Sequence, residues 1–294
     1  MKAVSALVSV LILAAWINVS YAMDWKKLHE TADKTMPSDA FMRVQANPTS
    51  VKDLYILGLI YLNQHKDDQS RNMFSEILKM EPNLLEARWG IAEVLRREHE
   101  LKKSRGILEE IIKAEPKFYP AYNSLAYIDY LEGDFEGAVS LAEKVLKQGR
   151  EAADLSNYVR AYLILGGAKG MIAHRGGPFS KVINGTAVLP NLKKAQELKP
   201  NSPEVFFGMG GFYLLAPGLA GGDINLAIAY LEKAVKTDPM FADAYVRLAQ
   251  AYMVKGDDAK YELYLRKALE IDPKNELALD AGSGRCKFIC PQKR

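Results

Sequence analysis

The chain has 294 residues, of which 49% are hydrophobic and 26% charged, a composition that is ordinary for a globular protein. Its formal net charge is only +3, and loss of Lys2 with a leader segment would lower it to 3 − 1 = +2. Such a near balance excludes strong long-range attraction to nucleic acid or to an acidic membrane surface.

The first 22 residues have the pattern of a secretory signal peptide. Lys2 is followed by an apolar run that includes LVSVLILAAWI, and small residues in Ser20-Tyr21-Ala22 suit cleavage after Ala22. The alternative is a retained membrane anchor, because the apolar run approaches the length that spans a bilayer. Polar Asn18 and the small-residue exit favour cleavage, so we expect an exported protein, periplasmic or secreted.

Residues 23–50 are expected to form a helical N-terminal cap, and a regular period follows. The spacing from Pro82 to Pro116 is 116 − 82 = 34, the spacing from Pro239 to Pro273 is the same, and each proline ends a helix-like stretch such as EILKMEP. A period of this length is typical of helix-turn-helix repeats that stack into a solenoid. The sequence therefore predicts an all-α fold, a right-handed superhelical solenoid.

Six repeats are expected between residues 51 and 275. Leu57-Gly58 in the first helix of one repeat matches Ile91-Ala92 in the next, and Ser70 in the second helix matches Ser104. Small residues at matching points let the two backbones approach closely, while large residues fill the seam between the helices. The expected repeats are 51–84, 85–118, 119–152, 153–202, 203–241 and 242–275.

The turn between the two helices of a repeat has a recurrent position where a left-handed residue is expected. Glycine is usual at such a helix end, and polar residues can replace it. Because the turns of adjacent repeats are held about 8 to 10 Å apart by helix packing, two turn histidines are not expected to hold one metal ion together. The position is occupied by His65, His99, Gly133 and Gly256.

This pattern of columns resembles the tetratricopeptide repeat family, whose Trp, Leu-Gly, Tyr, Ala, Phe, Ala and Pro it follows in order. Asp129, Arg150 and Tyr261 depart from the family pattern at single positions. The resemblance implies first helices that line the inside of the superhelix and a concave groove that binds protein partners. The Lys, Asn and Arg with which some family members hold a chain terminus do not recur here.

A stripe of first-helix side chains would face a ligand in that groove. Aromatic residues together with Arg and Asn are the mixture that anchors peptide segments. The alternative is that Trp89 and Tyr127 simply fill the gap between neighbouring first helices. The candidate groove residues are Tyr55, Leu59, Trp89, Arg96, Asn123, Tyr127, Tyr130 and Gln250.

Two insertions interrupt the period. The fourth repeat, 153–202, is longer than the period by 16 positions, and the fifth, 203–241, is longer by 5. In the fourth repeat we expect the first helix to run on to His174, and the second to be lengthened and bent at Pro190. Twelve of the 21 glycines fall between Gly166 and Gly222.

The two insertions are expected to project from the same edge of the stack, which makes that edge a candidate site. The alternative is that the glycines only allow close helix packing and form an ordered turn. The candidate residues at this edge are His174, Pro217, Gly221, Gly222 and Asp223.

The segment FFGMGGFYLLAPGLAGGDINLAIAYLEKAV is similar to a stretch in secreted bacterial repeat proteins, including the T-components associated with TRAP solute transporters. Those T-components are usually anchored by a lipid on a cysteine, and no cysteine stands at the expected cleavage site here. The resemblance implies an alternative role in periplasmic solute transport, with a ligand site or an oligomer contact at residues 166–222.

No catalytic or cofactor motif appears in the chain: GxSxG, HExxH and GxxxxGK[ST] are all absent. We therefore expect a scaffold for protein–protein interaction in envelope assembly, with no enzymatic activity, cofactor, metal or nucleic-acid partner. The identity of the partner and the oligomeric state remain open at this stage.

Cys286 and Cys290 are the only cysteines and stand together in GRCKFICPQKR. In an oxidising compartment two close cysteines most simply form a disulfide, whereas a metal site would need two more ligands. We predict that this bond ties the tail, residues 276–294. Mass spectrometry of the exported protein should find Cys286 linked to Cys290, and two free thiols would contradict the prediction.

Overall fold

The structure is a computed structural model that describes residues 23–284 and 287–291. All regular secondary structure in these residues is helical, with fifteen α-helices and one short 3-10 helix. This confirms the predicted all-α class. The expected signal peptide, residues 1–22, lies outside the described residues and stays a prediction.

Two short helices, α1 (Trp25–Ala32) and α2 (Pro37–Ala46), precede the repeats. The Asp24 carboxylate caps α1 by accepting a hydrogen bond from the Lys27 N–H, and Pro37 opens α2, where the N–H that it lacks would have no partner within the helix.

Helix α1 is tied to the body of the protein through His29, which is buried. Its Nε2 lies 2.9 Å from the Tyr55 hydroxyl, and its Nδ1 lies 3.4 Å from Asp154 Oδ2. Burial opposes ionisation of Asp154, but hydrogen bonds from His29 and Asn157 outweigh it and lower the pKa of that carboxyl group. The cap therefore joins the first repeat to the fourth.

Each of the six predicted repeat ranges contains a pair of helices, and one further helix, α15 (Glu276–Ser283), begins the C-terminal tail. The pairs are α3 (Val51–Asn63) with α4 (Asp67–Met80), α5 (Leu85–Arg97) with α6 (Leu101–Ala114), α7 (Tyr119–Glu132) with α8 (Phe135–Lys147), α9 (Leu155–Arg175) with α10 (Pro178–Leu198), α11 (Pro203–Leu215) with α12 (Ile224–Thr237), and α13 (Ala242–Lys255) with α14 (Asp258–Ile271).

The turns between paired helices contain the expected left-handed residues. Gly133 and Gly256 have φ angles of 92° and 85°. His65 and His99 have φ angles of 56° and 65°, and they are the only non-glycine residues with positive φ among those the structure describes. A polar side chain thus replaces glycine in the first two repeats, at a conformational cost that glycine would avoid.

Large and small residues interlock at the seam of each pair. The Phe74 ring, fully buried, lies against both Gly58 and Gly90, where added Cβ atoms would stand 2.7 and 2.4 Å from it. The Ser70 hydroxyl donates a hydrogen bond to the Gly58 carbonyl at 2.9 Å, so the small second-helix residue also bonds the first helix. The predicted packing of small against large residues is confirmed.

The first insertion lengthens both helices of the fourth repeat, and the second forms a loop between the two helices of the fifth. Helices α9 and α10 have 21 residues each; α9 runs past His174 to Arg175, and α10 continues through Pro190. Between α11 and α12 the chain forms the 3-10 helix η1 (Gly218–Ala220), which ends at left-handed Gly221 with φ 98°.

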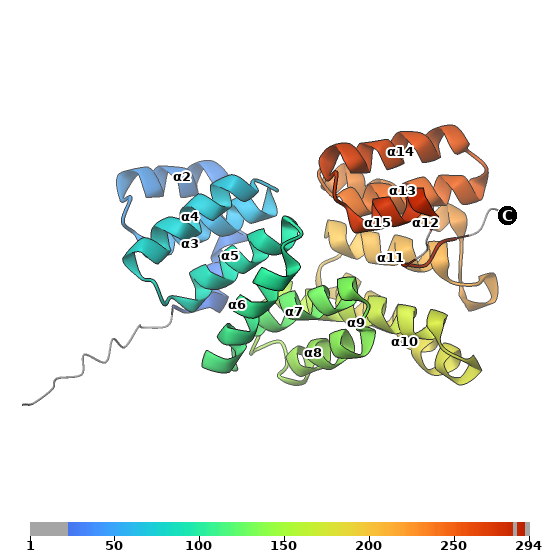
Figure 1. The fold of residues 1–294 in the computed structure, drawn as a ribbon, viewed down its shortest axis with the longest axis horizontal. Coiled ribbons are helices and arrows are strands. Elements are labelled where there is room, and N and C mark those ends of the chain that lie inside the picture. Colours follow the sequence, from blue (N-terminus) through green and yellow to red (C-terminus); the bar gives the residue numbers. More distant parts are fainter. Residues whose placement is uncertain (1–22, 285–286, 292–294) are drawn as a thin grey trace, which may run out of the picture.

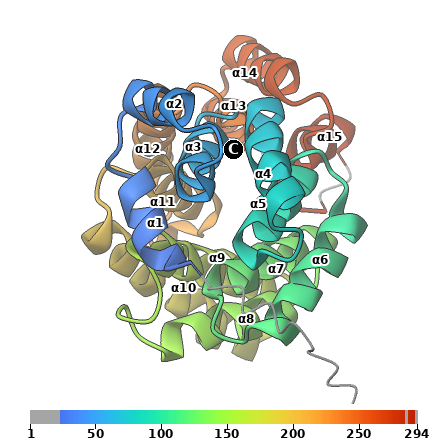
Figure 2. The same ribbon diagram turned by 90° about the vertical axis from the view of Figure 1, so that its left-hand side faces the viewer.

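The stacked pairs bend into a superhelix. Figure 1 shows the N-terminal repeats (blue to cyan) and the C-terminal repeats (orange to red) as two limbs that rise from the middle repeats α7 to α10. Seen at right angles, the helices surround a central axis (Figure 2). The two ends of the solenoid therefore approach each other.

We predict that Gly90→Ala destabilises the protein by about 1–3 kcal/mol, because the new methyl group overlaps the Phe74 ring in a seam without free space. Gly106→Ala is the matched control: it is also inside a helix, but no atom outside the neighbouring backbone of that helix lies within 4 Å of its added Cβ. Higher helix propensity should make that variant neutral or more stable by up to about 1 kcal/mol. Urea unfolding of both variants checks this, and an unchanged midpoint for Gly90→Ala would contradict it.

Candidate functional site

The inner face of the superhelix lines a cavity of about 1990 Å³. Side chains from α1, from all six repeats and from α15 line it. Its volume is about twice the upper end of the range of roughly 300–1,000 Å³ that is usual for small-molecule pockets. The cavity is therefore a feature of the whole superhelix and not of one repeat.

One wall of the cavity is apolar and comes largely from the two repeats that carry insertions. Phe207 packs against Phe241 with ring centroids 5.0 Å apart, which places two aromatic rings at this wall. Glycines along α9 and α11 carry no side chain and so keep the space open. The apolar wall includes Leu163, Met171, Leu189, Phe207, Phe212, Leu215 and Phe241, with Gly167, Gly170, Gly208 and Gly211 between them.

A polar part of the lining carries charge in a compact network around Glu93. Arg96 Nη2 lies 3.1 Å and Arg160 Nη1 lies 3.4 Å from Glu93 Oε2. Burial opposes ionisation of Glu93, but the charges of these two guanidinium groups outweigh it and hold its pKa well below the ordinary value. Glu93 is therefore a buried carboxylate that orders two arginines at the cavity.

Tyr127 extends this network across to the last repeat. Its ring lies 5.0 Å from the Arg96 guanidinium carbon, and its hydroxyl donates to Asp243 Oδ2 at 3.2 Å. The Asn275 amide donates to the other oxygen, Asp243 Oδ1, at 2.7 Å. Burial, and then the Asp243 charge, raise the pKa of Tyr127, so the phenol keeps the proton that it donates. The third and sixth repeats are thus bonded to each other.

Two further bonds, which we call the His–Asp latches, join the first two repeats to the last two. His65 Nε2 lies 2.8 Å from Asp238 Oδ2, and His99 Nε2 lies 3.1 Å from both carboxylate oxygens of Asp272. The spacing of the two histidines is 99 − 65 = 34 and that of the two aspartates is 272 − 238 = 34, so both partners follow the repeat. All four residues line the cavity.

Other charges face the latches from neighbouring elements. Arg97 Nη1 lies 3.4 Å from His65 Nδ1 and pairs with Asp67 at 3.2 Å. The hydrogen bond to Asp272 raises the pKa of His99 against the effect of burial, and Glu276 adds to the rise while Lys274 opposes it. The latches are therefore polar contacts between limbs, partly open to solvent.

Comparison with family models matches both ends of the solenoid. Residues 55–158 match a model described as the second ARM domain of tetratricopeptide repeat protein 21, and residues 219–276 match a tetratricopeptide repeat model. Together with the six helix pairs, these matches decide the family.

The chain belongs to the tetratricopeptide repeat family. A comparison with curated proteins found no match. The family models test neither the predicted signal peptide nor the resemblance to transporter T-components.

Solved structures of other proteins share the fold, among them two tetratricopeptide repeat proteins. A thermophilic one from Thermus thermophilus is 19% identical, with a TM-score of 0.56 over 68% of this chain and 98% of that chain. One from Parabacteroides merdae is 16% identical, with a TM-score of 0.52 over 87% and 96%. The Cut9–Hcn1 hetero-tetramer is 18% identical, with a TM-score of 0.55 over 88% and 48%. At such identities the likeness concerns the fold alone.

The tetratricopeptide groove predicted from the sequence is only partly open. Five of the eight predicted groove residues line the cavity: Leu59, Trp89, Arg96, Tyr127 and Tyr130. Trp89 is 5% exposed and donates to the Ser124 hydroxyl at 3.0 Å, so it also fills the gap between first helices.

The other three predicted groove residues are buried between helices. Tyr55 has no exposed surface and contacts His29. The Asn123 amide donates to the Asn157 carbonyl at 2.8 Å, and Gln250 Oε1 accepts from Arg247 at 2.8 Å. These side chains lie between stacked helices, and the placement of Tyr55 under α1 depends on the cap.

Of the residues predicted at the insertions, His174 and Pro217 line the same cavity. Gly221, Gly222 and Asp223 do not, and instead build an ordered turn. An added Cβ on Gly222 would stand 1.9 Å from the Ala216 carbonyl oxygen, and the Asp223 carboxylate caps α12 by accepting from the Asn225 N–H at 2.8 Å. The two predicted sites, groove and insertion edge, thus meet in one cavity.

The sequence interpretation missed Arg160, Asp238, Asp243 and Asp272, which complete the polar part of the lining and the latches. One signal was available: Asp238 and Asp272 both stand directly before prolines that follow the period. Their partners lie 173 residues earlier in the chain, so only the bend of the superhelix brings them together.

Neither a metal site nor a membrane span was found in the part of the chain that the structure describes. No group of three His, Cys, Asp or Glu there could hold a metal ion. No helix there is long and apolar enough to cross a bilayer. The predicted disulfide includes Cys286, which lies outside the described residues, and it stays a prediction.

We predict that the His99–Asp272 latch stabilises the protein more at pH 5.5 than at pH 8. The pKa of His99 is higher in the folded protein than in the unfolded chain, where it is about 6.5. The latch therefore contributes its full free energy of stabilisation below the pKa of the unfolded chain, and this contribution is lost as pH rises through the pKa of the folded protein. Hydrogen bonding to His99 lowers the pKa of Asp272 despite burial, so a second loss occurs only as pH falls through that lowered value, below about 3.9.

His99→Asn tests this, because Asn tolerates the left-handed backbone. Urea unfolding should show a loss of about 0.2–1 kcal/mol at pH 5.5 and a smaller loss at pH 8. Gly256→Asn changes the equivalent turn position of the sixth repeat, where the turn residue itself forms no latch, and its effect should not depend on pH. Equal losses for His99→Asn at both pH values would show that the latch does not carry the effect.

Proposed function

We propose that this chain is an exported scaffold that binds a partner protein by holding an extended or helical segment of it in the central cavity. The observation that carries the proposal is that one cavity of about 1990 Å³ unites residues of the predicted groove with residues of the insertions. Solenoids of stacked helix pairs use such inner surfaces for binding.

The size and chemistry of the cavity favour a peptide segment over a small metabolite. The volume exceeds the usual small-molecule range, and an α-helix with its side chains is about 10–12 Å wide. The lining combines apolar side chains, among them Phe207 and Phe212, with the polar side chains of Arg96, Arg160 and Tyr127. Aromatic and arginine side chains are the residues that dominate protein interfaces, and an amphipathic segment would satisfy both parts of the lining.

The latches define how a partner reaches the cavity. A continuous segment that enters between the limbs at the latches would have to break these side-chain pairs. Because the latches are single side-chain pairs that are partly exposed, each contributes about 0.2–1 kcal/mol, so a tightly bound partner can offset their loss.

The sequence pattern of residues 1–22 supports export, and we propose envelope assembly as the setting in which an exported protein of this kind binds its partner. The comparisons lend no support to the alternative role in solute transport. Tetratricopeptide repeat proteins are generally non-catalytic scaffolds, and the proposed function requires no reacting group.

Gly211→Trp provides a test, because Gly211 lines the cavity and no atom outside the neighbouring backbone of its own helix lies within 4 Å of its added Cβ. The indole should fill part of the cavity without disturbing the helix packing. Gly106→Trp is the matched control on α6, with equally open surroundings and no contact with the cavity. Partners are first captured by crosslinking in cells, and the captured segment is then titrated against purified wild type and both variants.

We expect Gly211→Trp to remain folded by circular dichroism and to bind the segment at least about tenfold more weakly, while Gly106→Trp binds as wild type does. Equal binding by folded Gly211→Trp would place the interaction outside the cavity and refute the proposal. So would a failure to capture any segment that binds the purified wild-type protein.

A further inference from the structure

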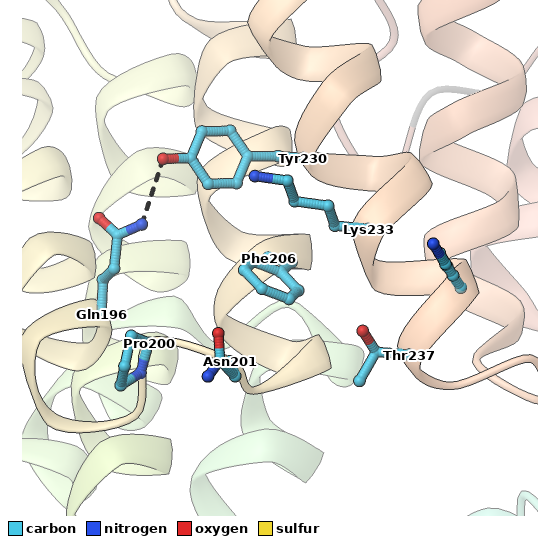
Figure 3. A pocket seen from close by; sticks show the side chains of 8 residues that line it. Gln196, Pro200, Asn201, Phe206, Tyr230, Lys233 and Thr237 are labelled. Carbon is cyan, nitrogen blue, oxygen red and sulfur yellow. Dashed lines mark hydrogen bonds between the residues drawn. The ribbon is translucent and has the colours of Figure 1, made fainter.

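A second, smaller cavity lies at the junction of the fourth and fifth repeats. Its volume is about 490 Å³, within the range that is usual for small-molecule sites. The end of α10, the turn that follows it, the start of α11 and the end of α12 line it (Figure 3). Its lining residues are Gln196, Pro200, Asn201, Phe206, Tyr230, Lys233, Lys236 and Thr237.

The charge of this pocket is positive and uncompensated. Lys233 and Lys236 are among its eight lining residues, and none of the eight is acidic. Neither lysine forms an ion pair with any residue that the structure describes, whereas ion pairs are frequent elsewhere in this protein. An anion entering the pocket would therefore meet two ammonium groups without displacing a carboxylate.

The floor of the pocket is aromatic. Phe206 is 9% exposed, and Figure 3 shows its ring between Asn201 and Lys233. The Lys233 Nζ atom lies 5.9 Å from the Phe206 ring centroid and 5.6 Å from that of Tyr230. A flat apolar group could thus stack on a ring while its charge reaches the ammonium group.

Neutral hydrogen-bonding groups complete the lining. The Gln196 amide donates to the Tyr230 hydroxyl at 3.1 Å, so the phenol accepts that bond and its own proton can bond a ligand oxygen. Asn201 and Thr237 add a side-chain amide and a hydroxyl at the opposite side, as Figure 3 shows. The lining therefore offers several uncharged hydrogen-bonding groups beside the two lysines.

The contact between Lys233 and Phe206 occupies a position that recurs in the repeat. In the second repeat Arg88 pairs with Glu110 at a sequence separation of 22. In the third repeat Lys144 lies 6.0 Å above the Tyr122 ring at a separation of 144 − 122 = 22. The separation of Lys233 from Phe206 is 233 − 206 = 27, which is 22 plus the five inserted positions. The contact itself is therefore a packing feature, and the cavity beside it carries the inference.

We propose that this pocket binds a small organic anion that carries a planar ring, with the anionic oxygens at Lys233 and Lys236 and the ring against Phe206 and Tyr230. This proposal concerns a different site from the central cavity, to which the proposed peptide binding is assigned. Pro200, Asn201 and Thr237 line both this pocket and the central cavity, so the bound anion would lie directly beside that cavity.

Isothermal titration calorimetry of the purified mature chain tests the proposal with benzoate, phenyl phosphate, inorganic phosphate and benzylamine as probes. Benzoate and phenyl phosphate should bind with dissociation constants of about 1 mM or below. Their ranking tells a carboxylate site from a phosphate site. Inorganic phosphate, which lacks the ring, and benzylamine, which has the opposite charge, should bind at least tenfold more weakly.

Variants locate the binding. The double change Lys233→Gln with Lys236→Gln should weaken the better ring-bearing anion at least tenfold. Lys144→Gln removes the equivalent lysine of the third repeat, which does not line the pocket, and should leave the affinity unchanged. The side chains of Lys233 and Lys236 are exposed, so the double variant is expected to keep its thermal unfolding midpoint.

Four results would overturn the proposal: no binding of either ring-bearing anion, binding of inorganic phosphate as tight as that of phenyl phosphate, binding of benzylamine as tight as that of benzoate, or equal weakening by Lys144→Gln and the double variant. The test needs no partner protein, so its outcome is independent of the proposed peptide binding.

Discussion

The bonds that tie the C-terminal limb of the superhelix to the N-terminal limb and to the middle repeats are the constraint on which the central cavity depends. A stack of helix pairs would otherwise present an open groove. Here Tyr127 bonds Asp243, and the His–Asp latches join the first two repeats to the last two. None of these contacts contributes much of the folding energy, which comes from the buried seams, but together they set the distance between the limbs.

One periodicity serves both stacking and closure. Phe74 packs between Gly58 and Gly90 because equivalent positions of successive repeats face each other. The same spacing places His65 opposite Asp238 and, one repeat further along both limbs, His99 opposite Asp272. The two latches are therefore equivalent bonds that differ by one repeat. The insertions act differently: the long α9 and α10 widen the middle of the superhelix and supply much of the apolar wall.

The sequence predicted the fold well, because the packing that creates the repeats is local and leaves a regular pattern of small, large and turn residues. It predicted the site less completely. Leu59, Arg96 and Tyr127 were recognised as inward-facing from their helical positions, and they line the cavity. Tyr55 occupies a comparable position but lies beneath α1, and the placement of that cap helix depends on the His29 contacts with two repeats that are distant in the chain.

By itself the sequence determined the helix pairs, the left-handed turns and the lengths of the two insertions, because each of these depends on residues within one or two repeats. The tertiary structure alone decided which of those residues meet across the axis. The small bend between successive pairs accumulates over the whole stack, so that His65 reaches Asp238, 173 positions away, and the groove becomes a cavity. The pocket at Lys233 likewise exists only because α10, α11 and α12 converge on it.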